Sequence, residues 1–128
     1  MKAAWMKPSM LLTAALMSGA AVSSAYADPA GEKLFKQQCA ACHAVAADAP
    51  RGMGPNLLGI VGRAAGQMTG FPYSNEFKKG MSDKTWSPEL LDAWLEDPQN
   101  LAPGTYMMYK QGDAAIRKSI IDYLQTAK

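Results

Sequence analysis

The stretch FKQQCAACHAV, residues 35–45, constrains this chain more than any other feature of its sequence. It contains both cysteines of the 128-residue chain and its only histidine, as Cys39, Cys42 and His43. A disulfide between cysteines this close in sequence would close a very small loop, and such a loop stabilises a fold only modestly. Other roles for the three residues therefore have to be weighed.

Four interpretations fit a C-x-x-C-H cluster. A thioredoxin-like pair would follow a strand in a βαβ unit, but here a helical pattern precedes the pair and no parallel-sheet pattern follows. A structural zinc site needs four ligands, and the chain has no further cysteine or histidine. A disulfide with an incidental histidine is the third interpretation. The fourth, which we favour, is the attachment of a c-type haem, for which C-x-x-C-H is the signature.

Each residue of the cluster has a task in a c-type haem site. Cys39 and Cys42 would form thioether bonds to the two vinyl groups, and His43 would lie beneath the ring and ligate the iron. Covalent attachment holds the haem without a deep pocket, which suits a small domain. We therefore expect one covalently bound haem c, with its iron, in this chain.

The N-terminal residues have the layout of a secretory signal peptide. Lys2 and Lys7 give a positive start, an apolar run occupies residues 10–22, and AYA at residues 25–27 offers a peptidase site. The run is too short to span a bilayer comfortably, although an uncleaved anchor is the alternative. We expect residues 1–27 to be a signal peptide, and residues 28–128 to form one periplasmic domain that does not insert into the membrane.

Charge narrows the choice of partners. Loss of Lys2 and Lys7 with the signal peptide would leave equal numbers of basic and acidic side chains. No basic block is present that could bind nucleic acid, and no polybasic patch is present that could bind a membrane surface. We expect a monomer that works with protein partners.

The remaining patterns predict an all-α fold. Helices are expected from Asp28 and Pro29 to the cysteines, from Ser87 to residue 97, and from Asp113 almost to the C-terminus. A short helix is expected around residues 74–79. Seven glycines lie between residues 51 and 80, where no long helix appears. These elements bury little apolar surface, so a large apolar cofactor wrapped by the loops would complete the core.

A second axial ligand cannot be a histidine of this chain, which leaves methionine as the usual partner in electron-transfer haem proteins. Met53, Met68 and Met81 lie among glycines and polar residues, without rigid support. Met107 and Met108 follow the turn APGT, which Pro103 stiffens, and form the better source. The residues themselves do not separate Met107 from Met108.

The chain from Gly31 to Leu124 resembles class I cytochrome c, of the mitochondrial type and its bacterial periplasmic relatives. The resemblance rests on GEKLFKQQCAACH, GPNLLGIVGRAAGQMTGFPYS, LLDAWLEDPQNLAPGTYM and RKSIIDYL, in family order and spacing. It implies that the N- and C-terminal helices cross, where Gly31 and Phe35 meet Ile120 and Tyr123. It also implies long loops wrapped around the haem.

The resemblance assigns further site residues. It implies that Met107 is the axial methionine and that the Pro55 carbonyl accepts a hydrogen bond from the ring of His43. Residues implied to surround the haem propionates are Arg63, Tyr73, Trp86 and Thr105. Trp94 stands where the family often has a tyrosine near the methionine sulfur, and Tyr109 replaces a common phenylalanine.

The family's ring of docking lysines is largely missing. Gln38, Gln99, Asn100 and Tyr106 occupy such positions, while Lys78, Lys79 and Lys110 are retained. The resemblance implies a one-electron carrier rather than an enzyme, shuttling between a dehydrogenase or cytochrome complex and an oxidase or reductase of a respiratory chain. The alternative function is a haem peroxidase or gas-binding sensor with a labile methionine ligand.

Overall fold

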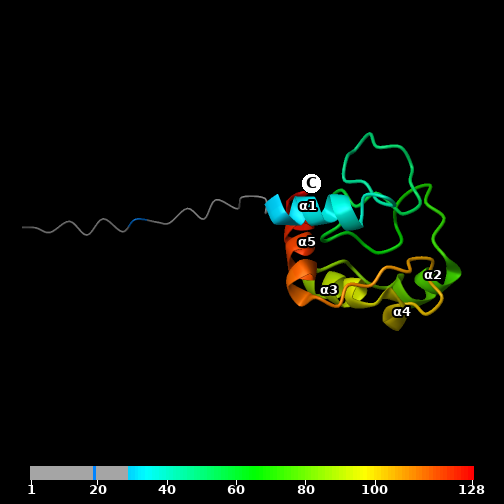
Figure 1. Cartoon of the computed structure of the whole chain (residues 1–128). Coiled ribbons are helices and arrows are strands. Elements are labelled where there is room, and N and C mark those ends of the chain that lie inside the picture. The colour runs from blue at the N-terminus through cyan, green and yellow to red at the C-terminus, as the bar shows by residue number, and fades with distance from the viewer. Residues whose placement is uncertain (1–18, 20–28) are drawn as a thin grey trace, which may run out of the picture.

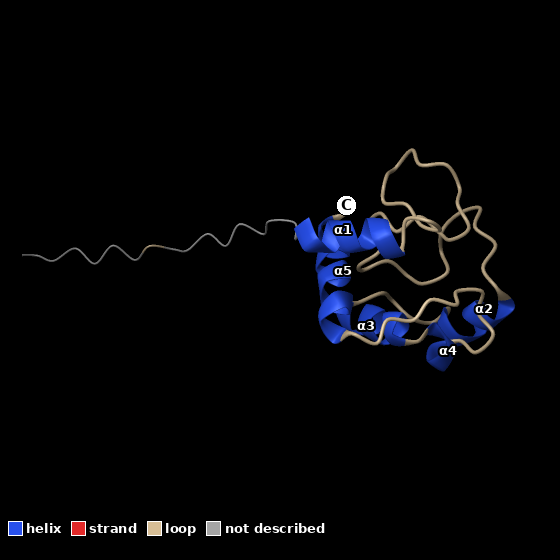
Figure 2. Ribbon diagram, in the orientation of Figure 1, coloured by secondary structure: helices blue, strands red, loops and turns tan. Residues whose placement is uncertain are grey.

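The computed structural model describes Gly19 and residues 29–128. The expected signal peptide, residues 1–27, lies outside the described residues apart from Gly19. The described part contains five helices joined by loops: α1 (Pro29–Gln38), α2 (Asn75–Met81), α3 (Pro88–Glu96), α4 (Pro98–Leu101) and α5 (Ala114–Thr126). In residues 29–128 the only β-type pairing is an isolated bridge between Ala64 and Thr85. The all-α prediction is therefore confirmed (Figure 2).

The first and last helices cross, as Figure 1 shows for α1 and α5. At the crossing, Gly31 lies so close to α5 that a Cβ atom there would collide with the Ser119 carbonyl and approach the Cβ of Tyr123 to 2.8 Å. The rings of Phe35 and Tyr123 pack nearby, with centroids 5.5 Å apart. Glycine at position 31 therefore sets how closely the two helices approach, as the family resemblance implies.

Local capping signals place the other helices. Ser74 accepts a hydrogen bond from the backbone N–H of Phe77 at the start of α2, and Ser87 caps α3 with Pro88 in the first turn. Asp113 accepts from two backbone N–H groups at the start of α5. These are the side-chain acceptors that satisfy free N–H groups of a helix start. The predictions for all three helices are confirmed.

The structure adds one helix and corrects one expectation. Pro98 begins the short helix α4 directly after α3, where the side chain of Asp97 accepts from the N–H of Gln99 at 3.0 Å. The expectation that Met81 lacks rigid support is wrong. Met81 closes α2 and is completely buried in the core, so it serves as a packing residue.

The core is shared between helices and loops. Its buried side chains come from α1, α2, α3, α5 and the segments between them, and they leave a hollow between the long loops and the helices. In Figure 1, the long loop between α1 and α2 lies above α2, α3 and α4, with α5 to one side. No helix in residues 29–128 has the length and apolar character needed to cross a bilayer.

Candidate functional site

The C-x-x-C-H cluster lies directly after α1. The chain continues turning there, because the N–H of Cys39 donates to the Phe35 carbonyl at 2.8 Å and the N–H of His43 donates to the Cys39 carbonyl at 2.9 Å. Both cysteines are free thiols rather than a disulfide. Cys39, Cys42 and His43 line one common cavity. The local turn thus presents the three side chains to the same space.

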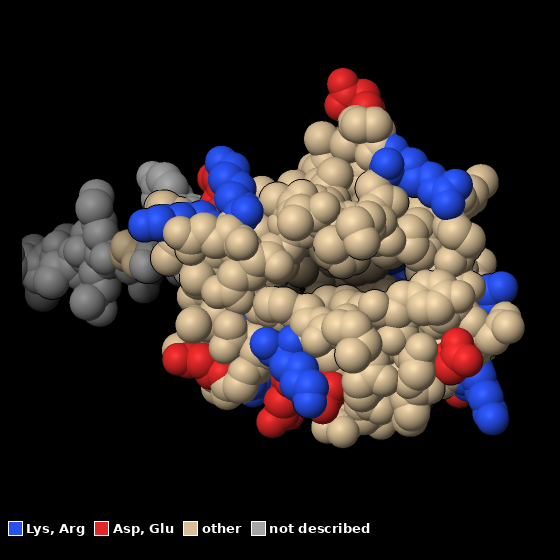
Figure 3. All heavy atoms as spheres, turned by 45° about the vertical axis from the view of Figure 1, so that its right-hand side comes forward, with Lys and Arg blue, Asp and Glu red and all other residues tan. Residues whose placement is uncertain are grey.

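This cavity has a volume of about 510 Å³, within the range of small-molecule and cofactor sites. It appears as the hollow at the centre of the face in Figure 3. Its apolar wall comes from loops and from α2, α3 and α5, and includes Leu57, Ile60, Phe77, Leu91, Trp94, Leu95, Ile120 and Leu124. All nine residues predicted for the site also line it: Cys39, Cys42, His43, Pro55, Arg63, Tyr73, Trp86, Thr105 and Met107.

His43 is fixed in one orientation by the next loop. Its Nδ1 lies 2.7 Å from the carbonyl oxygen of Pro55, which can only accept, so Nδ1 carries the proton and Nε2 keeps its lone pair. A Cβ at Gly54 would lie 2.7 Å from the same Nδ1. Burial lowers the pKa of His43, and the bond to Pro55 raises it by a smaller amount. A neutral imidazole with a free Nε2 is the form that ligates a metal.

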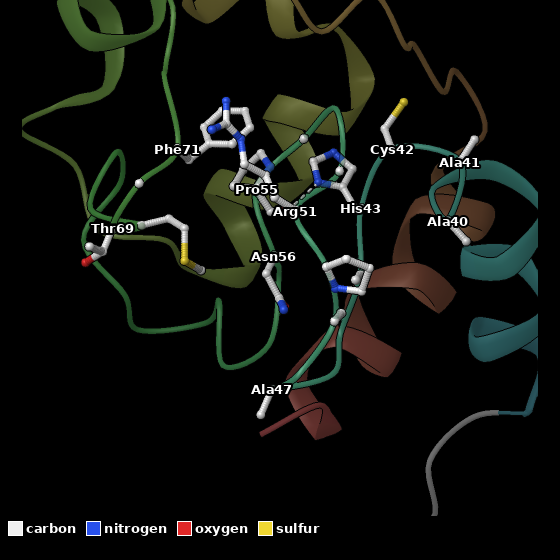
Figure 4. Close-up of a pocket in the computed structure, with 17 residues that line it drawn as sticks. Ala40, Ala41, Cys42, His43, Ala47, Arg51, Pro55, Asn56, Thr69 and Phe71 are labelled. Atoms are coloured by element: carbon white, nitrogen blue, oxygen red, sulfur yellow. Dashed lines mark hydrogen bonds between the residues drawn. The ribbon is translucent and has the colours of Figure 1, made fainter.

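A second cavity of about 420 Å³ adjoins the first one and is lined by residues from two loop segments, 40–56 and 68–71. Figure 4 shows the residues around it, with His43 bonded to Pro55 and with Arg51, Asn56 and Thr69 nearby. The two cavities share Cys42, His43, Gly54, Pro55 and Phe71. They are therefore separated by the segment that positions the histidine.

The thiol chemistry of the cluster does not favour exchange reactions. Burial, helped by the neighbouring Cys42, raises the pKa of Cys39 to about 11. Thiol exchange and zinc binding use the thiolate, which is disfavoured here. In residues 29–128 no group of three or more Cys, His, Asp or Glu side chains could hold a metal ion. The thioredoxin-like and zinc interpretations therefore find no support.

Met107 enters the cavity from another loop, after α4. Its sulfur accepts a hydrogen bond from the indole N–H of Trp94, with 3.2 Å between Nε1 and Sδ. Met107 is partly buried, whereas the side chain of Met108 is 75% exposed. The structure thus separates two methionines that their sequence positions alone do not separate.

Gln99, which the resemblance places at a docking position, holds the methionine loop, residues 102–109. The side-chain amide of Gln99 donates to the carbonyls of Thr105, at 3.0 Å, and Met107, at 3.4 Å. Its oxygen accepts from the N–H of Gly104 at 2.8 Å. One side chain therefore fixes three points of the turn that carries Met107. A lone glutamine in a helix as short as α4 gives no sequence signal for such a role.

A second polar cluster joins the cysteine motif to the methionine loop. The hydroxyl of Tyr109 donates to Oε1 of Gln38 at 2.6 Å, and the amide of Gln111 donates to the same oxygen at 3.0 Å. Burial raises the pKa of Tyr109, so its hydroxyl stays a donor. These bonds connect residues more than seventy positions apart, and the sequence had not predicted them.

The four residues expected to surround the propionates already have partners or packing contacts in the protein. Arg63 donates to the carbonyls of Asn56 and Leu58, at 2.8 and 3.1 Å, and the Tyr73 hydroxyl accepts from the N–H of Met68. Trp86 and Thr105 are buried, and the ring of Trp86 packs 5.7 Å from that of Trp94. All four lie on one cavity.

The comparisons with known proteins agree with this geometry. The model of the family described as Cytochrome c matches residues 29–128. Cytochrome c2 of Rhodomicrobium vannielii is 44% identical over 99 residues, which cover 73% of this chain and 77% of that protein. Cytochrome c-type cyt cy of Rhodobacter capsulatus is 40% identical over 98 residues, 76% of this chain but only 47% of that protein.

A solved structure, that of cytochrome c2 from Rhodospirillum centenum, superposes with a TM-score of 0.69 at 34% identity. The match covers 77% of this chain and 95% of the solved chain. The fold, the C-x-x-C-H motif and these relatives agree on an electron carrier with one covalent c-type haem, and not on an enzyme. The chain belongs to the cytochrome c family.

Proposed function

We infer that this chain is an exported, periplasmic one-electron carrier in which His43 and Met107 are the two axial ligands of the haem iron. The observation that carries this proposal is the pair of fixed donors on one cavity. Nε2 of His43 has a free lone pair because Nδ1 is bonded to Pro55, and the sulfur of Met107 is held by Trp94. The two donors come from separate loops and line the same apolar space.

The residues present fit a haem. Cys39 and Cys42 are free thiols beside the cavity, so both are available for thioether bonds. The wall is largely aliphatic and aromatic, which suits the apolar ring and excludes water from it. The haem supplies the one-electron chemistry when it is bound. The protein orients the ligands, excludes water and lowers the dielectric constant around the site.

The polar residues suit the carboxylate groups of such a cofactor. Arg63 uses two carbonyl acceptors to fix its guanidinium, and its other N–H groups are available to a carboxylate. Tyr73, Trp86 and Thr105 add further donors on the same cavity. A buried carboxylate needs such partners because its desolvation is costly. We assign the propionates to these four residues.

Export is supported by the signal-peptide layout of residues 1–27. The partners are redox proteins that dock at the mouth of the haem cavity.

The alternative, a peroxidase or gas sensor with a labile methionine, is not favoured, because the matched relatives are electron carriers. The bond from Trp94 and the three bonds of Gln99 also act against release of Met107.

Ligand binding tests the proposal. The protein, produced with haem-attachment machinery and reduced at neutral pH, should show a c-type haem spectrum and should not bind carbon monoxide rapidly. Rapid formation of a carbon monoxide complex by the unmodified protein would mean that the sixth position is open, and would favour the sensor or peroxidase. Absence of haem absorbance would overturn the proposal altogether.

A further inference from the structure

We propose that the mouth of the haem cavity is an uncharged, apolar docking surface, and that it fits a redox protein whose own docking face is apolar and carries little net charge. This proposal rests on the proposed function and specifies the kind of partner. The surface is defined by Met53, Tyr106 and Met108, together with the cavity mouth that they border. We call it the apolar rim.

The apolar rim combines side chains from two separate loops. Met53 is 82% exposed, Tyr106 is 76% exposed and Met108 is 75% exposed, and these are the exposed large hydrophobic residues of the described part of the chain. Single exposed apolar residues are normal on a protein surface. Here all three border the same cavity, and a gathering of apolar side chains at one opening is typical of an interaction site.

Charge is nearly absent from the same place. Of the residues that line the cavity, Arg63 is the only Lys, Arg, Asp or Glu, and its guanidinium is bonded to the carbonyls of Asn56 and Leu58. Figure 3 shows mainly uncharged residues around the hollow, with one small basic group visible at its edge and the other charged side chains lying farther out. A partner with an acidic face would therefore find no complementary charge at the mouth.

One basic and two polar side chains of this part of the protein are engaged in contacts within it. Lys110 forms an ion pair with Asp97 at 3.1 Å, so its charge is largely compensated. Gln38 accepts hydrogen bonds from the side chains of Tyr109 and Gln111. Gln99 donates to the carbonyl of Thr105 and accepts from the N–H of Gly104. These side chains hold the fold together and add no net charge to the rim.

Methionine and tyrosine suit contact with a partner rather than with water alone. Methionine is flexible and polarisable, so it adapts to irregular apolar surfaces, and tyrosine is enriched at interfaces because it offers both area and a hydroxyl. A neutral apolar face should associate at a rate that depends little on ionic strength, because there is no long-range attraction to screen.

Electrode monolayers of defined chemistry test this directly with the haem-loaded protein. Gold is coated with alkanethiols that end in methyl and hydroxyl groups, or in carboxylates, and protein-film voltammetry measures adsorption and electron exchange. We expect adsorption and a one-electron wave on the methyl–hydroxyl monolayer that are unchanged between about 0.01 M and about 0.5 M salt. Adsorption on carboxylate alone, lost as salt increases, would overturn the proposal.

Lysine substitutions locate the surface. Met108→Lys and Tyr106→Lys should each lower adsorption on the methyl–hydroxyl monolayer about fivefold or more, and should create salt-dependent adsorption on carboxylate. The charge-matched control is Gln125→Lys, at an exposed position of α5 that does not line the cavity. Equal effects of all three substitutions would show that the rim is not the contact surface and would overturn the proposal.

Two other occupants have distinct outcomes. Sedimentation velocity that shows dimers of the unmodified protein, lost in Met108→Lys, would assign the rim to a second copy of this chain. Binding to phosphatidylcholine vesicles, lost in the same variant, would assign it to a lipid surface. Either result overturns the redox-protein partner. A reversible one-electron wave with dissolved mediators separates these failures from failure of the proposed function, which would abolish that wave.

Discussion

The indole N–H of Trp94 donates a hydrogen bond to the sulfur of Met107, with 3.2 Å between the two atoms. Trp94 belongs to α3 and is 6% exposed, so the donor comes from a rigid, buried element. Its ring also packs against Phe77 and Trp86. The helix core thereby fixes the side chain that we assign as the second iron ligand.

Trp94→Phe should lower the reduction potential. With haem bound through Met107, the N–H dipole would place positive charge beside the ligating sulfur and disfavour the ferric form. The substitution removes this dipole while keeping an aromatic ring. A hydrogen bond worth about 0.5–1.5 kcal/mol corresponds to about 20–60 mV for one electron. Equilibrium redox titration measures the shift. Trp94→Tyr, which keeps a donor group, should recover part of it, and equal potentials for Phe and the native residue would contradict this role.

Gly54→Ala should displace the histidine ligand. A Cβ at this position would lie 2.7 Å from Nδ1 of His43 and closer still to the ring carbon Cε1. Overpacking of this kind costs about 1–3 kcal/mol. We expect a lower melting temperature and a disturbed haem spectrum. Gly112→Ala is the matched control, because nothing lies within 4 Å of the added atom. Indistinguishable behaviour of the two variants would rule out the close approach.

Gln99→Ala should loosen the methionine loop. The substitution removes the bonds to the carbonyls of Thr105 and Met107 and to the N–H of Gly104. Since these groups are only partly buried, we expect a loss of about 1–2 kcal/mol in the free energy of unfolding. The methionine–iron absorbance should also disappear at lower denaturant concentration. The adjacent Asn100 is exposed, so Asn100→Ala should change neither property.

Local signals explain why much of this fold could be predicted from the sequence. Ser74, Ser87 and Asp113 cap helices because a side-chain oxygen next to a free N–H is a short-range interaction. Gly31 was predicted to lie at a helix crossing, and the collision of a Cβ with Ser119 confirms it. For the cavity, the C-x-x-C-H motif supplied Cys39, Cys42 and His43, and the resemblance to class I cytochrome c supplied the other six lining residues that were expected.

Hydrogen bonds of glutamine side chains could not be predicted in the same way. Gln99 and the cluster of Gln38, Tyr109 and Gln111 act through hydrogen bonds whose partners depend on the folded loops. A single glutamine in a short helix or at a helix end has no periodicity or spacing that would reveal such a task. The error at Met81 has a related cause, because the glycine beside it suggested a loop, whereas tertiary packing buries the side chain at the end of α2.

The most direct test of the account compares two adjacent methionines. Met107 is held by Trp94 and lines the cavity, while Met108 is largely exposed. Absorbance spectra and redox titrations of Met107→Ala and Met108→Ala measure which sulfur ligates the iron. We predict that Met107→Ala abolishes the methionine–iron band and lowers the potential on the order of 0.2 V, while Met108→Ala leaves both unchanged. Loss of the band in Met108→Ala, with Met107→Ala unaffected, would contradict the assignment.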